Sequence, residues 1–266
     1  MRFLSIRDGT WICVYFSVVA GLLGAVLGSF LNCAAWRIAH EEPFWKGRSH
    51  CPACGHTLGA ADLVPVFSWL FLRGRCRYCG EKISPRYPVT ELLFALITLC
   101  CLWRFDLTVE ALRNWILFCC LYCLSLVDLE VYLIPNGALI LGAAAWLAAL
   151  PFMGYSWLEI GGYLLAAVVF GGGMLLISLV LDKVLGRESL GGGDVKLFAL
   201  VGLYLGLAGT LFALMAACVL GLIFAGLRRL IKGTGGQLPF GPAIAAAAAG
   251  MLLWGDGLIG WYLSLF

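Results

Sequence analysis

Long apolar runs recur from one end of the chain to the other, and they constrain the fold more than any other feature. Only 12% of the 266 residues are charged, against about 25% in an ordinary soluble domain. About 20 apolar residues cross a bilayer as an α-helix, which alone satisfies its own backbone hydrogen bonds in lipid. The runs are therefore interpreted as eight spans: 11–35, 89–104, 112–127, 137–153, 157–181, 195–208, 209–227 and 242–264.

Glycines refine this interpretation. Gly21, Gly24 and Gly28 lie on one side of the first span and predict close packing against a neighbouring helix. A break at Gly206 to Gly209 separates the sixth span from the seventh. The first span is too long for a cleaved signal peptide, and no small-residue cleavage site follows it. The sequence predicts an all-α integral membrane protein with about eight transmembrane helices.

The basic residues predict the orientation. With the amino terminus outside, all but four of the 18 Lys and Arg residues fall on the inner side. Cytosolic loops carry the excess of positive charge, so this orientation is favoured. The four on the outer side are Arg2, Arg7, Arg104 and Arg113.

One sizeable aqueous segment interrupts the apolar pattern and is expected to face the cytosol. We divide the chain into a first transmembrane helix at 1–35, this loop domain at 36–91, and a transmembrane domain at 92–266. The loop contains two CxxC pairs, each followed by a glycine, a spacing typical of a zinc-ribbon-like site for structural Zn²⁺. The predicted ligands are Cys51, Cys54, Cys76 and Cys79.

Alternatives remain open for this loop. The cysteines could form disulfides or a redox pair, although the cytosol keeps thiols reduced. His50 or His56 could replace one cysteine as a ligand, but surface histidines on a polar loop are the simpler interpretation. A segment this short buries little core, so a bound metal would supply folding energy.

Two acidic residues stand at the ends of expected spans. Asp128 closes the third span and Asp194 opens the sixth, after Gly191, Gly192 and Gly193. Two crossings separate them, so both carboxyl groups are expected at the cytosolic boundary. Two carboxyl groups about 3 Å apart share one proton, as in aspartic proteases. We therefore predict a catalytic pair that needs no metal.

The residues around Asp194 are interpreted as substrate-binding. Three glycines without side chains would let an extended substrate backbone approach Asp194 closely. Lys196, two residues further on, is also placed in this site. The simpler alternative makes Asp194 a helix cap and Asp128 an interfacial charge. The two residues together, on one face, are harder to explain in that way.

On these motifs the chain resembles the type IV prepilin peptidase family, whose aspartyl proteases carry a GxGD signature. The resemblance extends over nearly the whole chain. One departure is Asn136, where many relatives carry an aspartate. The matching segments are Gly28–Asn32, the cysteine loop within 51–92, Asp128, the Gly191-x-Gly193-Asp194-x-Lys196 motif and Pro239–Pro242.

The resemblance implies an inner-membrane endopeptidase that cleaves the basic leader of prepilins or pseudopilins after a glycine, on the cytosolic side. Such substrates assemble into type IV pili or type II secretion pseudopili. It also implies methylation of the new amino terminus with S-adenosylmethionine, since relatives that methylate usually carry the cysteine loop. The expected partners are these substrates and the lipid bilayer, with no nucleic acid.

Two other functions fit part of the pattern. An ion-coupled transporter would explain acids among apolar spans, but such proteins often show internal repeats, and none is visible here. A zinc-ribbon membrane adaptor without catalysis would explain the cysteines alone. Neither explains a pair of acids on one face.

Overall fold

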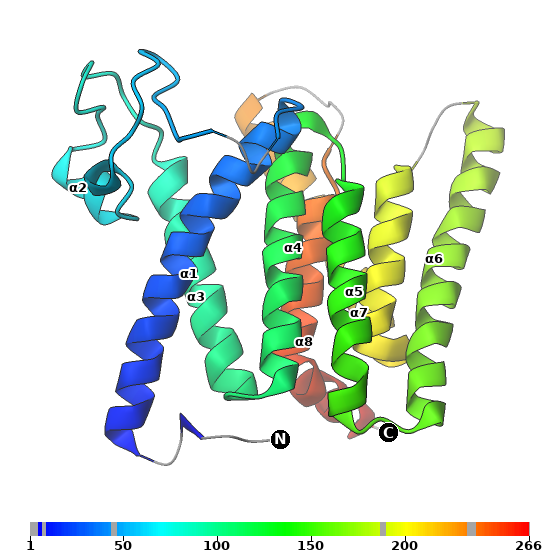
Figure 1. The fold of residues 1–266 in the computed structure, drawn as a ribbon. Coiled ribbons are helices and arrows are strands. Elements are labelled where there is room, and N and C mark those ends of the chain that lie inside the picture. Colours follow the sequence, from blue (N-terminus) through cyan, green and yellow to red (C-terminus); the bar gives the residue numbers. More distant parts are fainter. Residues whose placement is uncertain (1–4, 7–8, 44–46, 187–189, 233–237, 266) are drawn as a thin grey trace. The chain divides into compact units, whose positions relative to one another are not determined.

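The computed structural model describes residues 5–6, 9–43, 47–186, 190–232 and 238–265. Within these ranges the chain is helical, without β-strands, and only two isolated β-bridges occur, both in the cysteine loop. The elements are α1 (Thr10–Ala39), η2 (Ala60–Asp62), α2 (Phe67–Phe71), α3 (Arg86–Phe105), α4 (Val109–Val131), α5 (Asn136–Met153), α6 (Trp157–Leu185), α7 (Gly192–Lys232) and α8 (Gly241–Leu263) (Figure 1).

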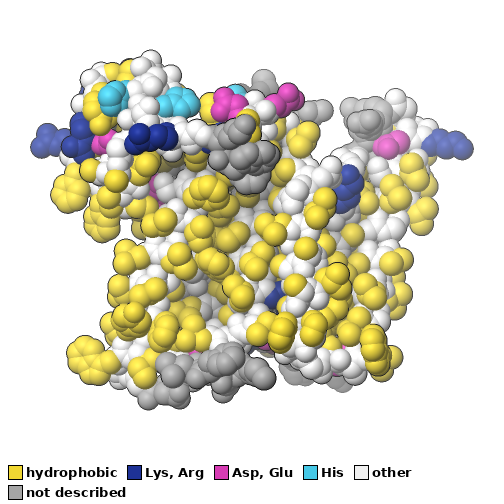
Figure 2. Space-filling view, in the orientation of Figure 1, with side chains coloured by type: hydrophobic (Ala, Val, Ile, Leu, Met, Phe, Trp, Pro, Cys, Tyr) yellow, Lys and Arg dark blue, Asp and Glu magenta, His cyan; other side chains and the backbone are white. Residues whose placement is uncertain are grey.

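Seven of the described helices are long and apolar enough to cross a membrane: α1 and α3 to α8. Their surfaces carry many exposed large hydrophobic side chains, such as Trp157 (89% exposed) and Leu158 (87%). In Figure 2 hydrophobic side chains cover the visible flanks of the helices, whereas most visible charged side chains gather near helix ends. This distribution suits lipid around the flanks and confirms a multi-pass membrane protein.

The chain divides into two compact units, residues 1–111 and 112–266. The first contains α1, the cysteine loop and α3, and the second contains α4 to α8. The boundaries that the sequence suggested, 1–35, 36–91 and 92–266, stay a prediction.

In the first unit, α1 packs tightly on α3. A Cβ atom on Gly24 would lie 2.8 Å from Cα of Ala95, and one on Gly28 would lie 3.1 Å from Cα of Glu91. Larger residues at these two positions would push the helices apart. Gly21 is less constrained, since its nearest neighbour, Leu99, would be 3.8 Å away. The predicted close packing through small residues is confirmed.

In the second unit, α7 folds back on itself at Gly206, whose backbone is non-helical (φ 64°, ψ −171°). The ring of Phe240 lies 6.4 Å from that of Phe198, and a Cβ on Gly221 would lie 3.0 Å from the same ring. In a straight helix, residues 198 and 221 would be about 34 Å apart. The two arms of α7 are therefore antiparallel, as the predicted break at Gly206 to Gly209 requires, and seven helices provide eight helical segments.

The fold-back brings several helix ends of the second unit together. The C-terminal end of α4 and the N-terminal ends of α5, α7 and α8 meet there. Arg228, near the end of α7, donates a hydrogen bond to the Tyr132 hydroxyl just after α4. Of the basic residues behind the predicted orientation, Arg2, Arg7, Lys46 and Arg187 lie outside the described residues, and the orientation stays a prediction.

Candidate active site and candidate metal centre

Asp128 lies in the last turn of α4 and is 5% exposed. Its Oδ2 accepts a hydrogen bond of 2.9 Å from the backbone N–H of Gly241. Gly241 begins α8, where backbone N–H groups have no partner within the helix and favour a negative charge. The start of α8 therefore holds the Asp128 carboxyl group in place.

Gly241 contacts Asp128 directly, and the sequence interpretation did not assign it to the site. A Cβ atom on it would lie 2.7 Å from Oδ2 of Asp128, so a side chain would displace the carboxyl group. Pro242 follows in the first turn of α8, where its missing N–H costs nothing. The Pro239–Pro242 motif was the available signal, but its partner is 113 residues away in the chain.

Asp194 lies in the first turn of α7, and its backbone N–H donates to the carbonyl of Gly191 at 3.0 Å. Phe240 precedes the Gly241 that holds Asp128, and its ring lies 6.4 Å from that of Phe198, about one turn after Asp194. The predicted approach of the two acids at one end of the helices thus agrees with the structure. Their catalytic roles are taken up below.

The segment that follows Asp128 is docked against the segment around Asp194. A Cβ on Gly193 would lie 2.8 Å from Cβ of Ile134, so only glycine permits this approach. Nζ of Lys196 donates a hydrogen bond of 2.9 Å to Oδ1 of Asn136. These two contacts lie on either side of Asp194 in the chain and fix α7 to the start of α5.

The four predicted substrate-binding residues differ in how much space the structure leaves beside them. Gly193 faces Ile134, and Lys196 is held by Asn136. A Cβ on Gly191 would lie 3.3 Å from Oδ2 of Asp194, whereas one on Gly192 would meet no described atom within 4 Å. Gly192 is therefore the glycine with open space beside it. Contact of any of the four with substrate stays a prediction.

In the first unit, the four predicted cysteine ligands converge. Their sulfur atoms all lie within 4.8 Å of one another, and those of Cys51 and Cys79 are 3.9 Å apart. Tetrahedral Zn²⁺ with bonds of about 2.3 Å needs sulfur atoms about 3.8 Å apart. All four are free thiols, and no histidine belongs to this group in the part of the chain that the structure describes. The spacing therefore fits a four-cysteine metal site.

Two matching turns build this site. Gly55 and Gly80 adopt φ of +70° and +73°, a region that favours glycine. Their N–H groups donate to the carbonyls of Cys51 and Cys76 at 2.8 and 3.0 Å. Each turn thus places its two sulfur atoms on the same side, as the spacing of the CxxC pairs predicted.

The thiols of the two turns differ in acidity. The backbone N–H of Cys54 lowers the pKa of Cys51 to about 7, with help from the N–H of Ala53. The backbone N–H of Glu81 also lowers the pKa of Cys79, but burial and the neighbouring sulfur atoms outweigh it and raise that pKa to about 12. Four thiolates at this spacing need a cation between them, and Zn²⁺ would supply it.

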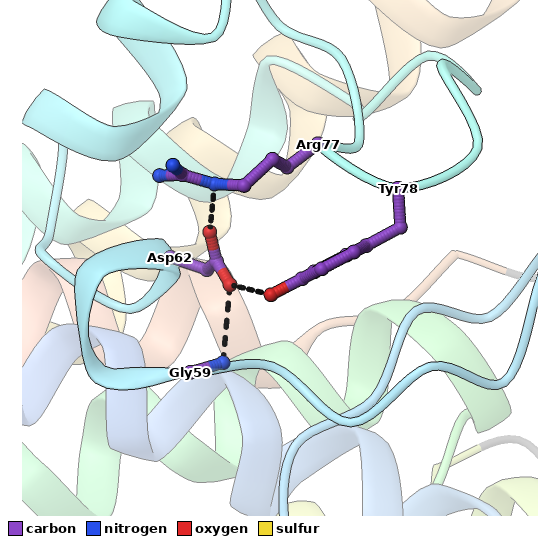
Figure 3. A network of polar contacts seen from close by, with 4 residues as sticks. All are labelled: Gly59, Asp62, Arg77 and Tyr78. Carbon is purple, nitrogen blue, oxygen red and sulfur yellow. Dashed lines mark hydrogen bonds and ion pairs between the residues drawn. The ribbon is translucent and has the colours of Figure 1, made fainter.

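Asp62 ties the two halves of the loop together. Its carboxylate accepts hydrogen bonds from the backbone N–H of Gly59 (3.1 Å), Nε of Arg77 (2.7 Å) and the Tyr78 hydroxyl (3.1 Å), as Figure 3 shows. The Gly59 N–H is the main reason why the pKa of Asp62 is lowered, and Arg77 and Tyr78 add to it. Because Arg77 and Tyr78 lie between Cys76 and Cys79, this contact fixes the second turn.

The fold and the site together define a multi-pass membrane protein with one buried and one half-buried carboxyl group at the helix ends and a four-cysteine loop. Residues 22–105 match the model of the bacterial peptidase A24 N-terminal domain, and residues 115–226 match that of the type IV leader peptidase family. The chain belongs to the type IV leader peptidase family. This membership favours a peptidase over the transporter and adaptor alternatives.

Several curated proteins are similar over most of their length. A prepilin leader peptidase/N-methyltransferase of Pseudomonas putida is 33% identical, covering 91% of this chain and 92% of that protein. One of the same name from Bacillus subtilis (strain 168) is 34% identical, covering 92% and 96%. A type 4 prepilin-like proteins leader peptide-processing enzyme of Escherichia coli O78:H11 is 36% identical, covering 86% and 90%. No solved structure matches the chain.

Proposed function

We propose that this chain is a membrane aspartyl endopeptidase that removes the basic leader of type IV prepilins or pseudopilins, cleaving after a glycine. The observation that carries the proposal is the placement of Asp128 and Asp194, from two different helices, at one end of the second unit. The printed names of the relatives support the substrate class.

Two neighbouring carboxyl groups can hydrolyse a peptide bond by general acid–base catalysis. One carboxylate acts as general base and takes a proton from a water molecule, whose oxygen attacks the scissile carbonyl carbon. The other carboxyl group, still protonated, donates a hydrogen bond to the carbonyl oxygen. Breaking the C–N bond transfers a proton to the leaving amine, and the pair returns to its single shared proton. Because Gly241 engages Oδ2 of Asp128, Oδ1 is the atom of that group left for the reaction.

We further propose that the enzyme methylates the new amino terminus, as the names of the relatives indicate for those proteins. S-Adenosylmethionine supplies an electrophilic methyl group. A C–N bond forms to the amine, the C–S bond breaks with its electron pair left on sulfur, and the amine nitrogen releases a proton. The cysteine site would hold structural Zn²⁺ in Cys51, Cys54, Cys76 and Cys79.

The proposed location is the bacterial inner membrane, with the aspartate pair and the cysteine loop on the cytosolic side. Lys183, Lys196, Arg228 and Arg229 all belong to the helix ends near Asp194, in agreement with the excess of positive charge in cytosolic segments. A leader bearing Lys or Arg residues would then be cleaved on the side where it is made.

Co-expression with a prepilin tests the peptidase proposal. Asp128→Asn and Asp194→Asn should each lower the rate of leader removal by about 10² to 10⁴, because neither variant can share a proton between two carboxyl groups. Asp256→Asn in α8 is the matched control, since it removes an exposed carboxylate. It should leave processing unchanged. Full processing by either active-site variant, at equal membrane levels, would remove the aspartyl mechanism.

A further inference from the structure

The short helix α2 presents three large apolar side chains to the outside of the first unit. Phe67, Leu70 and Phe71 are 55%, 56% and 83% exposed. Positions three and four residues apart lie on the same side of a helix, so these side chains form one apolar face. Exposed apolar faces mark sites that contact a membrane, a protein or a ligand.

The other side of α2 is packed into the cysteine loop. Nε1 of Trp69 donates a hydrogen bond of 3.0 Å to the carbonyl of Ile83. Gly74, with φ +67°, lies so close that a Cβ on it would be 2.9 Å from the Trp69 indole. The loop therefore holds α2 by its Trp69 side. The outer face is left for a partner outside the part of the loop that the structure describes.

A hydrogen bond fixes the position of α2 along a membrane-spanning helix. The backbone N–H of Val66, directly before α2, donates to Oε2 of Glu91 in α3 at 2.8 Å. The exposed apolar side of α3 begins nearby, since Val89, Leu92 and Leu96 are each at least half exposed and recur at helical spacing. With a rise of about 1.5 Å per residue, Glu91 lies about 3 Å beyond Val89 along α3. Thus α2 begins at about the depth where α3 already faces lipid.

The segment around α2 is also basic. Residues 63–90 contain one acidic residue, Glu81, and five basic ones. Where Figure 1 labels α2, Figure 2 shows hydrophobic side chains with Lys and Arg side chains above them. Basic side chains beside an apolar, aromatic face are typical of segments that lie in a membrane interface. The five basic residues, all exposed, are Arg73, Arg75, Arg77, Lys82 and Arg86.

We propose that α2 lies in the interface of the bilayer, with its outer face among the acyl chains of one leaflet. Arg73 and Arg75, which follow α2 closely, then lie at anionic phospholipid headgroups. The bilayer accounts for the exposed aromatic face, the depth fixed by Glu91 and the excess of positive charge together. This contact would hold the cysteine loop against the membrane between α1 and α3. It depends neither on leader cleavage nor on methyl transfer.

Protein partners explain fewer of these features. A second copy of the chain, paired symmetrically through this face, would bring two basic clusters into one interface. A prepilin with a basic leader would be repelled by the same arginines. The second unit could cover the face, and it is therefore an explicit outcome of the test below.

Photo-cross-linking identifies the occupant. The full-length protein with Phe71→benzoylphenylalanine, which keeps an aromatic side chain, is irradiated in phosphatidylglycerol nanodiscs, and the products are identified by mass spectrometry. Adducts with lipid should dominate. Thr57→benzoylphenylalanine, at an exposed polar position of the same loop, is the matched control and should give at least about fivefold less lipid adduct. Adducts of the Phe71 variant mainly with residues 112–266, with a second copy or with added prepilin would overturn the proposal.

The lipid charge tests the role of the arginines. Lipid adducts of the Phe71 variant should be at least about twofold more abundant in phosphatidylglycerol than in phosphatidylcholine nanodiscs, because basic residues near the surface favour anionic lipid. Adding Arg73→Gln and Arg75→Gln should remove most of this difference. Arg104→Gln, the same change of charge at the other end of α3, should keep it. Equal yields in the two lipids would overturn the assignment of the arginines to headgroups.

Discussion

The backbone N–H of Gly241 donates a hydrogen bond of 2.9 Å to Oδ2 of Asp128, which lies 113 residues earlier in the chain. This contact joins the start of the last helix to the end of α4. It gives the Pro239–Pro242 motif a physical role, which is to hold one of the two candidate catalytic groups.

Gly241→Ala should therefore lower the rate of leader removal by about tenfold or more, because its Cβ would lie 2.7 Å from the Asp128 carboxylate oxygen. Gly250→Ala in the same helix is the matched control, since a Cβ there meets no described atom within 4 Å. Processing is followed by the electrophoretic shift of the prepilin. Equal rates in the two variants would show that this contact does not position Asp128.

Two of the three glycines before Asp194, Gly192 and Gly193, should respond differently to replacement by alanine. Gly193→Ala forces its Cβ to 2.8 Å from Ile134 and should destabilise the protein by about 1 to 3 kcal/mol, visible as a lower melting temperature. Gly192→Ala has room and should leave the melting temperature unchanged. If a substrate backbone passes beside Gly192, this variant should raise KM without altering stability. An unchanged KM would remove Gly192 from the substrate site.

Metal analysis of the purified protein should find one zinc ion per chain. Cys54→Ala should abolish this zinc, since a tetrahedral site cannot lose one of four ligands without weakening greatly. Cys218→Ala, in α7 and far from this group in sequence, should keep it. A properly folded wild-type protein without metal would contradict the zinc proposal.

Asp62→Asn should speed zinc release to a chelator by about two- to fivefold, because the charged contact with Arg77 is lost. The pKa of Asp62 is lowered below its usual value, so its stabilising effect is present at pH 7 and pH 5 and disappears only as the pH falls through that lowered pKa. The difference between variant and wild type should therefore be the same at pH 7 and pH 5. Its disappearance between these values would contradict the assigned contact. Glu42→Gln serves as the control.

Local patterns in the sequence predicted most of the fold. The apolar runs located the helices, and the glycines of the first span predicted its packing on α3. The break at Gly206 was visible because a glycine interrupts an apolar run that is long enough for two spans. Counting crossings placed Asp128 and Asp194 at the same end, since an even number of spans lies between them.

Contacts between distant residues could not be predicted in this way. Nothing near Gly241 indicates that its N–H meets Asp128, and nothing near Asn136 indicates that it accepts from Lys196. The positive φ of Val66 runs against the preference of a β-branched residue, so no local rule would suggest it. The same holds for Glu91, whose partner lies 25 residues away.

The reversal at Gly206 also bears on how the chain enters the bilayer during synthesis. The first arm of α7 reaches only about 21 Å, less than the roughly 30 Å of the hydrocarbon core, and no polar loop separates it from the second arm. It cannot be threaded across alone, so both arms must insert together as a helical hairpin. Asp194 consequently reaches its final depth only after the residues beyond Gly206 have left the ribosome, and a shorter nascent chain holds no assembled aspartate pair.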